Sequence, residues 1–163
     1  MKDKLSVLGK KLINAELTVG TVEHCTSGLL GASISSICGL NCVYKGTIVT
    51  VDAEHMENLV EVSQNIFKHN GLVSSQVACQ MALGGLYKLN VDICVSVVGN
   101  VDSNDDQDNV VWICIAIMTD KKVDFKYDKL NVNGLRGKNI EVVINRTLDI
   151  LIDEIENIKN KED

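Results

Sequence analysis

The sequence contains no proline and few aromatic residues. Phe, Trp and Tyr together make up 4% of the 163 residues, whereas hydrophobic residues make up 45%. The core must therefore be built mainly from the aliphatic side chains of Val, Ile and Leu. A chain of this length is most simply a single domain, and it can bury roughly two-thirds of the surface that its unfolded form exposes.

The chain also lacks an excess of positive charge. It carries 16 Lys and Arg residues against 22 Asp and Glu residues, for a formal net charge of −6. Its longest basic runs are the pairs Lys10-Lys11 and Lys121-Lys122. Because nucleic-acid-binding domains normally carry a basic patch, we expect no nucleic-acid partner.

Long apolar segments and targeting signals are missing as well. The longest apolar runs, Val91 to Val98 and Val110 to Met118, are too short to span a bilayer. The first residues, MKDKLSVLGKKLINAEL, alternate charged and apolar positions, unlike a signal or transit peptide. We therefore expect no membrane partner and a soluble, cytoplasmic protein.

Six cysteines are present, but their positions do not indicate a disulfide framework. Cys94 and Cys114 lie in strand-like apolar runs, and Cys79 lies in a helical pattern. Free cysteine commonly behaves as a small buried hydrophobic residue, so we predict that role here. The protein is then better suited to a reducing cytoplasm than to an oxidising compartment.

A metal site would need three or four ligands that converge on one point. The sequence offers a small set of candidate ligands, namely His24, Cys25, Cys38, Cys42 and His55. The interval from Cys38 to Cys42 resembles that of zinc sites, but no second Cys or His pair has ligand spacing. The acidic loop at 102–108 lacks the glycine and terminal glutamate of an EF-hand. We therefore expect no metal and no cofactor.

Apolar segments alternate with amphipathic ones along the whole chain. Strands are predicted at 17–23, 43–51, 91–98 and 110–118, with an edge strand at 122–127. Helices are predicted at 3–15, 27–37, 53–60, 63–70, 75–89 and over the tail at 140–158. Gly71 should end the fourth helix, and Ser74 should cap the fifth. Strands that are apolar on both faces and are separated by helices predict a three-layer α/β/α sandwich.

The stretch TVEHCTSGLLGAS, residues 21–33, joins a strand to a helix through small polar residues. A junction of this kind directs several backbone N–H groups to one spot, where an anion or an oxyanion could bind. His24 stands in the middle of it.

Four segments together resemble a known family. In chain order they read VEHCTSG, GTIVTVDAEHM, HNGLVSSQVACQMALGGL and VDICVSVVGNV. They resemble the C-terminal domain of the competence/damage-inducible protein CinA, a family that includes nicotinamide-nucleotide amidases. The resemblance covers about residues 5 to 155 and implies the same fold. Its most specific part runs from His69 to Met81.

The resemblance places the family's reactive residues at three positions of this chain. The family turn AESCTGG reads VEHCTSG here, so His24 stands in place of the nucleophilic serine. Val51 stands in place of the family's tyrosine, and Met56 in place of its lysine. Other positions match the family and are candidates to line a pocket or bind a ligand, namely Glu23, Cys25, Thr26, Gly28, Glu54, Gly99 and Arg136.

The three substitutions bear directly on the activity that the resemblance implies. A family amidase would attack the carboxamide of nicotinamide mononucleotide with the serine, activated by the lysine and the tyrosine. Methionine cannot accept that proton and valine cannot relay it, so we expect a CinA-like domain that no longer hydrolyses the substrate. The alternative is an active nicotinamide mononucleotide amidohydrolase, or a related amidase, that works through altered residues such as His24 and Cys25.

Each residue of the turn has two interpretations. Cys25 is either a thiol activated by the helix N-terminus or a buried residue beneath the turn. Thr26 either binds an anion or caps the helix. His24 is either a base or a neutral histidine that fills the pocket. We favour a buried Cys25, a helix-capping Thr26 and a neutral His24 that fills the pocket.

Two expectations concern partners. The resemblance implies a pyridine nucleotide or another small anion as ligand, although the aspartates of the 102–108 loop (Asp102, Asp105, Asp106 and Asp108) would repel a phosphate. It also implies a homo-oligomer, which the small residues of the fifth helix (Ala78, Ala82, Gly84 and Gly85) and the aliphatic C-terminal helix would allow.

Overall fold

The computed structural model describes residues 1–102, 109–120 and 122–162. Within these residues five strands form one sheet, in the order β2-β1-β3-β4-β5. The strands are β1 (Val19–Glu23), β2 (Tyr44–Val49), β3 (Ile93–Gly99), β4 (Val110–Met118) and β5 (Val123–Asn131). β2, β1 and β3 run parallel, while β4 and β5 add to them as antiparallel strands.

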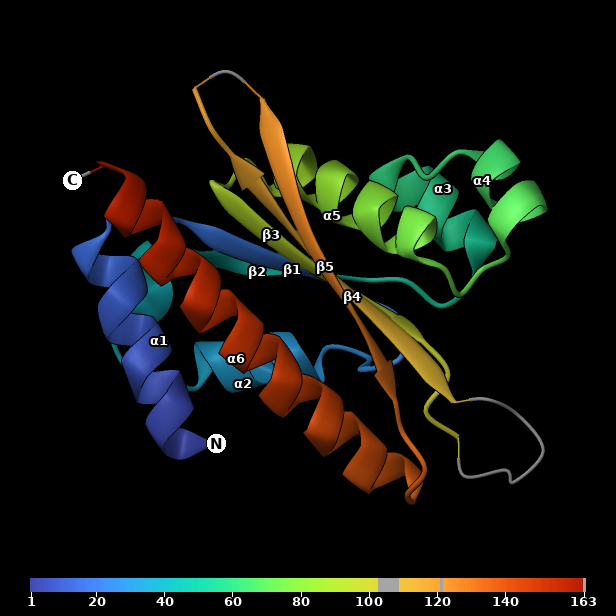
Figure 1. Cartoon of the computed structure of the whole chain (residues 1–163), viewed down its shortest axis with the longest axis horizontal. Coiled ribbons are helices and arrows are strands. Elements are labelled where there is room, and N and C mark those ends of the chain that lie inside the picture. The colour runs from blue at the N-terminus through green and yellow to red at the C-terminus, as the bar shows by residue number, and fades with distance from the viewer. Residues whose placement is uncertain (103–108, 121, 163) are drawn as a thin grey trace.

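Helices cover both faces of the sheet (Figure 1). On one face lie α1 (Lys2–Asn14), α2 (Leu29–Ser35) and α6 (Arg136–Glu162), whose apolar side chains form one core cluster with the sheet. On the other face lie α3 (Ala53–Val60), α4 (Gln64–Asn70) and α5 (Ser75–Leu89), with a second core cluster. A short 3-10 helix, Leu40–Cys42, precedes β2. The predicted three-layer α/β/α sandwich is confirmed.

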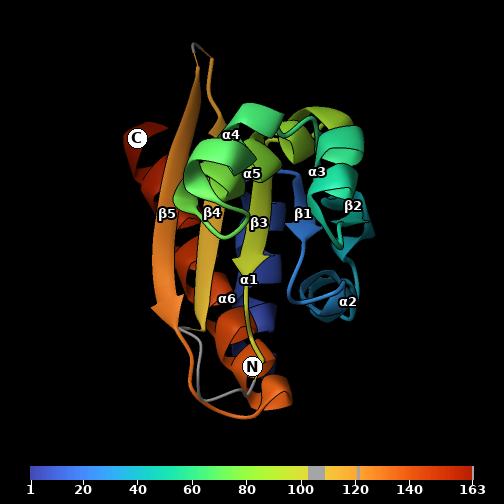
Figure 2. The ribbon, with the colours of Figure 1, turned by 90° about the vertical axis from the view of Figure 1, so that its right-hand side faces the viewer.

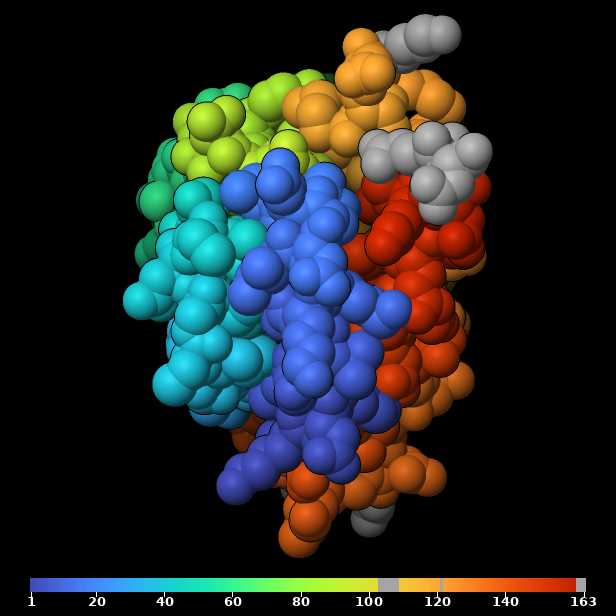
Figure 3. Space-filling model, turned by 90° about the vertical axis from the view of Figure 1, so that its left-hand side faces the viewer, coloured from blue at the N-terminus to red at the C-terminus, as the bar shows by residue number. Residues whose placement is uncertain are grey.

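The two terminal helices lie side by side, as the outer surface in Figure 3 shows. Leu5, Leu8 and Leu12 of α1 are buried on the inner side of that helix. Lys4 forms an ion pair with Asp149 of α6 at 2.7 Å, and Lys11 forms another with Glu156. No helix among the described residues is long and apolar enough to cross a membrane.

Several predicted boundaries shift for identifiable reasons. β1 begins at Val19 rather than at residue 17, because the backbone N–H and hydroxyl of Thr18 donate to the carboxylate of Asp92. β2 ends at Val49, so Val51 lies in the loop before α3. α2 begins at Leu29, β5 continues to residue 131, and α6 begins at residue 136.

The predicted ends of α4 and α5 are confirmed. Gly71 follows α4 with a φ of 75°, and the hydroxyl of Ser74 accepts a hydrogen bond from the N–H of Val77 at 3.3 Å.

The small residues of α5 allow this helix to pack closely on other elements of the same chain. A Cβ atom on Gly85 would lie 2.2 Å from Val22 Cγ2 in β1, and one on Gly84 would lie 1.9 Å from the carbonyl oxygen of Val60 in α3. Ala78 and Ala82 are fully buried. These residues therefore let α5 pack closely on the sheet and on α3. They no longer support the prediction of a homo-oligomer, which remains untested.

Candidate functional site

Three positions of the family site gather at one edge of the sheet. His24 follows β1, Val51 lies two residues beyond β2, and Gly99 ends β3. Because these three strands are parallel, their carboxyl ends meet at the same edge (Figure 2). Ligands of open α/β sheets commonly bind at such an edge.

A buried carboxylate organises the turn after β1. Glu23 has no exposed surface, and one of its oxygens accepts hydrogen bonds from the N–H groups of Gly28 at 2.9 Å and Leu30 at 3.1 Å. Its other oxygen accepts one from the N–H of Gly31 at 2.7 Å. The expectation that these N–H groups point at a bound anion is wrong, because the anion is a side chain of the protein itself.

Thr26 and Gly28 complete this arrangement. The hydroxyl of Thr26 donates to Glu23 at 2.5 Å and is fully buried, so it neither binds an external anion nor caps the helix directly. Gly28 is the residue before α2 and has a φ of 90°, a left-handed conformation that glycine adopts without strain. The match of Glu23, Thr26 and Gly28 to the family pattern therefore corresponds to one structural unit, the capped turn.

Cys25 packs beneath the turn. It is 4% exposed, lies in the core cluster under α2, and burial raises the pKa of its thiol to about 12. Since the thiolate is the nucleophilic form, this thiol is not activated at neutral pH.

His24 is half-buried at the mouth of the site. Its backbone N–H donates to Val97 in β3 at 2.9 Å, which fixes the residue against the sheet. Burial lowers the pKa of the ring, and the charge of Arg136 lowers it further, while backbone groups of Val51 and Gly99 and the charge of Asp52 act in the opposite sense. Among the described residues, no group lies within hydrogen-bonding distance and angle of Nδ1. The lowered pKa thus favours the neutral ring, whose Nδ1 is buried without a partner among the described residues.

The other two substituted positions lie in different environments. Val51 is 68% exposed. Met56 has no exposed surface and belongs to the second core cluster, together with Val60 and Met81. The structure thus brings Val51 near His24 but directs Met56 into the core.

The remaining candidates lie around the rim. Glu54 is exposed in the first turn of α3 and lines an open groove with Gln64 and Phe67. A Cβ atom on Gly99 would lie 2.5 Å from the carbonyl oxygen of Val110, so only glycine fits there. Arg136 begins α6 and pairs with Asp102. The other aspartates of the acidic loop lie outside the described residues.

One pair near His24 was missed by the sequence analysis. A carboxylate oxygen of Asp52 accepts hydrogen bonds from both the backbone N–H of His55, at 2.9 Å, and its ring nitrogen Nδ1, at 2.8 Å. These bonds with His55 lower the pKa of Asp52. An aspartate just before a helix, with histidine three residues on, is a capping pattern that could have revealed the pair. No three metal-ligating side chains gather anywhere in the described part of the chain.

Comparison with known proteins assigns the family. The family model described as CinA C-terminal domain matches residues 2–155. The chain belongs to the CinA C-terminal domain family. The fold and the order of its motifs are therefore those of a CinA domain.

Curated relatives of the chain differ in length. Protein MG115 homolog of Mycoplasma pneumoniae is 32% identical over 154 residues, which cover 91% of this chain and 97% of the relative. A CinA-like protein of Flavobacterium psychrophilum is 34% identical over 151 residues, which cover 91% of this chain but only 36% of that protein. The chain thus spans about a third of the longer relative.

Solved CinA superfamily structures share the fold. One from Klebsiella pneumoniae has a TM-score of 0.87 at 18% identity, over 95% of this chain and 97% of that one. One from Escherichia coli has a TM-score of 0.84 at 21% identity, over 91% and 87%.

Proposed function

We propose that this chain is a CinA domain that does not hydrolyse nicotinamide mononucleotide. The observation that carries the proposal is the environment of the three substituted positions. A serine amidase needs a nucleophile and a base within hydrogen-bonding reach of each other. Here the nucleophile position holds a neutral imidazole, His24, and the base position holds Met56, whose side chain is buried in the core.

Nearby residues do not replace the missing nucleophile and base. Cys25 is adjacent to His24, but its thiol is buried and has a pKa raised to about 12. The amide N–H groups of Gly28, Leu30 and Gly31 are bound to Glu23, so they do not serve an oxyanion. Since Cys25 and Glu23 both match the family pattern, the proposal depends on the substituted positions.

The retained role that fits this site best is binding of a small anion, with a pyridine nucleotide as the first candidate. Arg136 supports this role, because its charge acts on the His24 ring and its ion pair with Asp102 is exposed to solvent. An anion that displaced Asp102 would meet the guanidinium of Arg136. Asp102 itself opposes binding, so we expect weak affinity.

A second function rests on one specific observation. The partial exposure of the His24 ring at the mouth of the site and its lowered pKa are properties of a general base that could activate water. The alternative is therefore an amidohydrolase that uses His24 as base instead of a serine nucleophile.

Ammonia release from nicotinamide mononucleotide separates the two functions. We expect none above the background of a heat-denatured sample. If the unmodified protein does release ammonia, His24→Ala and Cys25→Ala identify the residue used, and Cys38→Ala, an exposed cysteine outside the site, is the matched control. Release that is lost in His24→Ala and retained in Cys38→Ala would establish the alternative.

A further inference from the structure

Two cysteine thiols meet where α5 crosses β4. The Sγ atoms of Cys79 and Cys114 lie 3.3 Å apart, and the thiol of Cys114 donates a hydrogen bond to Cys79. Both are free thiols. The sequence predicted each of them only as a small buried hydrophobic residue. The two cysteines are 35 positions apart, and no sequence pattern indicates that they are in contact.

The two thiols differ in accessibility. Cys114 has no exposed surface, whereas Cys79 is partly exposed and packs against the second core cluster. Cys114 is paired with Tyr127 of β5, whose side chain is 56% exposed. A small solute can therefore reach Cys79 first, with Cys114 directly behind it.

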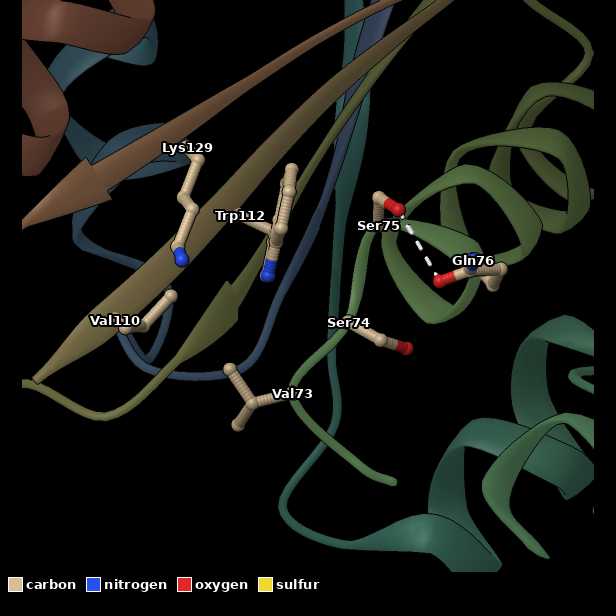
Figure 4. Close-up of a pocket in the computed structure, with 7 residues that line it drawn as sticks. All are labelled: Val73, Ser74, Ser75, Gln76, Val110, Trp112 and Lys129. Carbon is tan, nitrogen blue, oxygen red and sulfur yellow. Dashed lines mark hydrogen bonds between the residues drawn. The ribbon is translucent and has the colours of Figure 1, made fainter. Parts of the chain in front are cut away.

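An open pocket lies between the start of α5 and the strands β4 and β5 (Figure 4). Ser75 and Gln76 from the first turn of α5 line it together with Trp112 of β4 and Lys129 of β5. Ser75 lies one helical turn before Cys79, on the same face of the helix, and Trp112 lies two residues before Cys114, on the same face of the strand. Residues that line the pocket thus precede both cysteines on the same faces of α5 and β4.

The hydrogen bond shifts the pKa values of the two thiols in opposite directions. The hydrogen bond that the Cys114 thiol donates lowers the pKa of Cys79, and the same bond together with burial raises the pKa of Cys114. The thiolate is the form that reacts with an oxidant, so the more accessible sulfur is also the more reactive one. Burial raises the pKa of Cys94 and Cys25, which makes these two unreactive by comparison.

We propose that Cys79 and Cys114 form an oxidation site that a peroxide converts into a disulfide between α5 and β4. The thiolate of Cys79 attacks one peroxide oxygen, the O–O bond breaks, and Cys79 becomes a sulfenic acid while the first water leaves. The sulfur of Cys114 then attacks the sulfur of Cys79, the S–O bond breaks, and the departing hydroxyl takes the thiol proton of Cys114 and leaves as a second water. The two thiols supply two electrons and two protons, and one peroxide is reduced to two waters.

Hydrogen peroxide treatment of the reduced, full-length protein tests the proposal. We expect the intact mass to fall by two hydrogen atoms, peptide mapping to recover a crosslink between Cys79 and Cys114, and a thiol reductant to reverse both changes. Trp112 is the only tryptophan of the chain and lies two residues from Cys114, so its fluorescence should change with the same time course. Cys79→Ser should abolish the crosslink and the fluorescence change completely.

Two further variants make the result decisive. In Cys114→Ala the oxidation of Cys79 should stop at the sulfenic acid, which a sulfenic-acid-selective reagent would trap. The double variant Cys38→Ser, Cys42→Ser removes the two exposed cysteines and should form the crosslink like the unmodified protein. A crosslink between any other pair of cysteines, or oxidation in which Cys79 keeps its free thiol, would overturn the proposal.

Discussion

The carboxylate of Glu23 determines the shape of the turn after β1. It accepts three backbone N–H groups of the turn and of α2, together with the hydroxyls of Thr26 and Thr21. The sequence identified Glu23 only as a match to a family pattern. Its role could not be predicted, because these bonds exist only once the turn has its folded geometry.

Replacing Glu23 by glutamine tests this role. All the partners of the carboxylate are donors, so the new NH₂ group would face another N–H or O–H group in either orientation of the amide. We expect Glu23→Gln to lower the free energy of unfolding by about 2 to 3 kcal/mol in urea titrations. Glu54→Gln, at an exposed position, should change it by less than about 0.5 kcal/mol. Equal stability of the two variants would contradict the assigned role.

The ionisation of His24 gives a second test. Its pKa is lowered from 6.5 mainly by burial, so its ring should titrate below pH 6.5 in NMR spectra. The Cε1–H resonance can be assigned by its absence in His24→Gln. Because the unfolded chain then binds the proton more readily, the contribution of His24 to stability should fall as the pH drops below 6.5 toward the folded-state pKa. A titration midpoint above 6.5 would mean that the ring is charged when folded and paired with an anion.

Elements with strong patterns could be predicted well. β3 is buried at every residue, and its apolar run identified it, although the strand spans Ile93–Gly99 and not the predicted 91–98. β5 is an edge strand with mostly exposed side chains, so its weak pattern gave too short a range. β2 was predicted to end two residues too late, because the β-branched residues after Val49 belong to a loop that Asp52 closes by capping α3.

Close packing of α5 on β1 can be tested at one glycine. A Cβ atom on Gly85 would lie 2.2 Å from Val22 Cγ2 and 2.6 Å from Cys94 Sγ, so Gly85→Ala should destabilise the protein by about 1 to 3 kcal/mol. Gly137→Ala is the matched control in α6, where the new atom would meet no heavy atom of the described residues within 4 Å. That change should be neutral or stabilising by up to about 1 kcal/mol. Thermal unfolding of both variants decides whether α5 packs as closely as described.

The fold class of the molecule was predictable, but the arrangement of its site was not. Motif order identified His24, Val51 and Met56 as the substituted positions, yet it could not reveal that Met56 lies in the core while Val51 is exposed. The difference depends on how α3 packs on α5, which a linear offset does not encode.

Self-association is the prediction that concerns the assembled protein. Several apolar side chains remain exposed on the monomer, among them Tyr87, Phe125, Tyr127 and Val142. We still predict a homo-oligomer, now supported by these surfaces rather than by the small residues of α5. Light scattering at about tens of micromolar protein measures it, and a monomer at that concentration would refute it.

Ammonia release tests the central claim most directly, when the unmodified protein and His24→Ser are assayed side by side with excess nicotinamide mononucleotide. We expect no release from either, because restoring the serine leaves no base beside it while Val51 and Met56 remain. Both proteins must first show the same thermal unfolding, so that a negative result reports chemistry and not misfolding. Ammonia from the unmodified protein would contradict the loss of hydrolysis, and ammonia from His24→Ser alone would contradict the role given to the missing base.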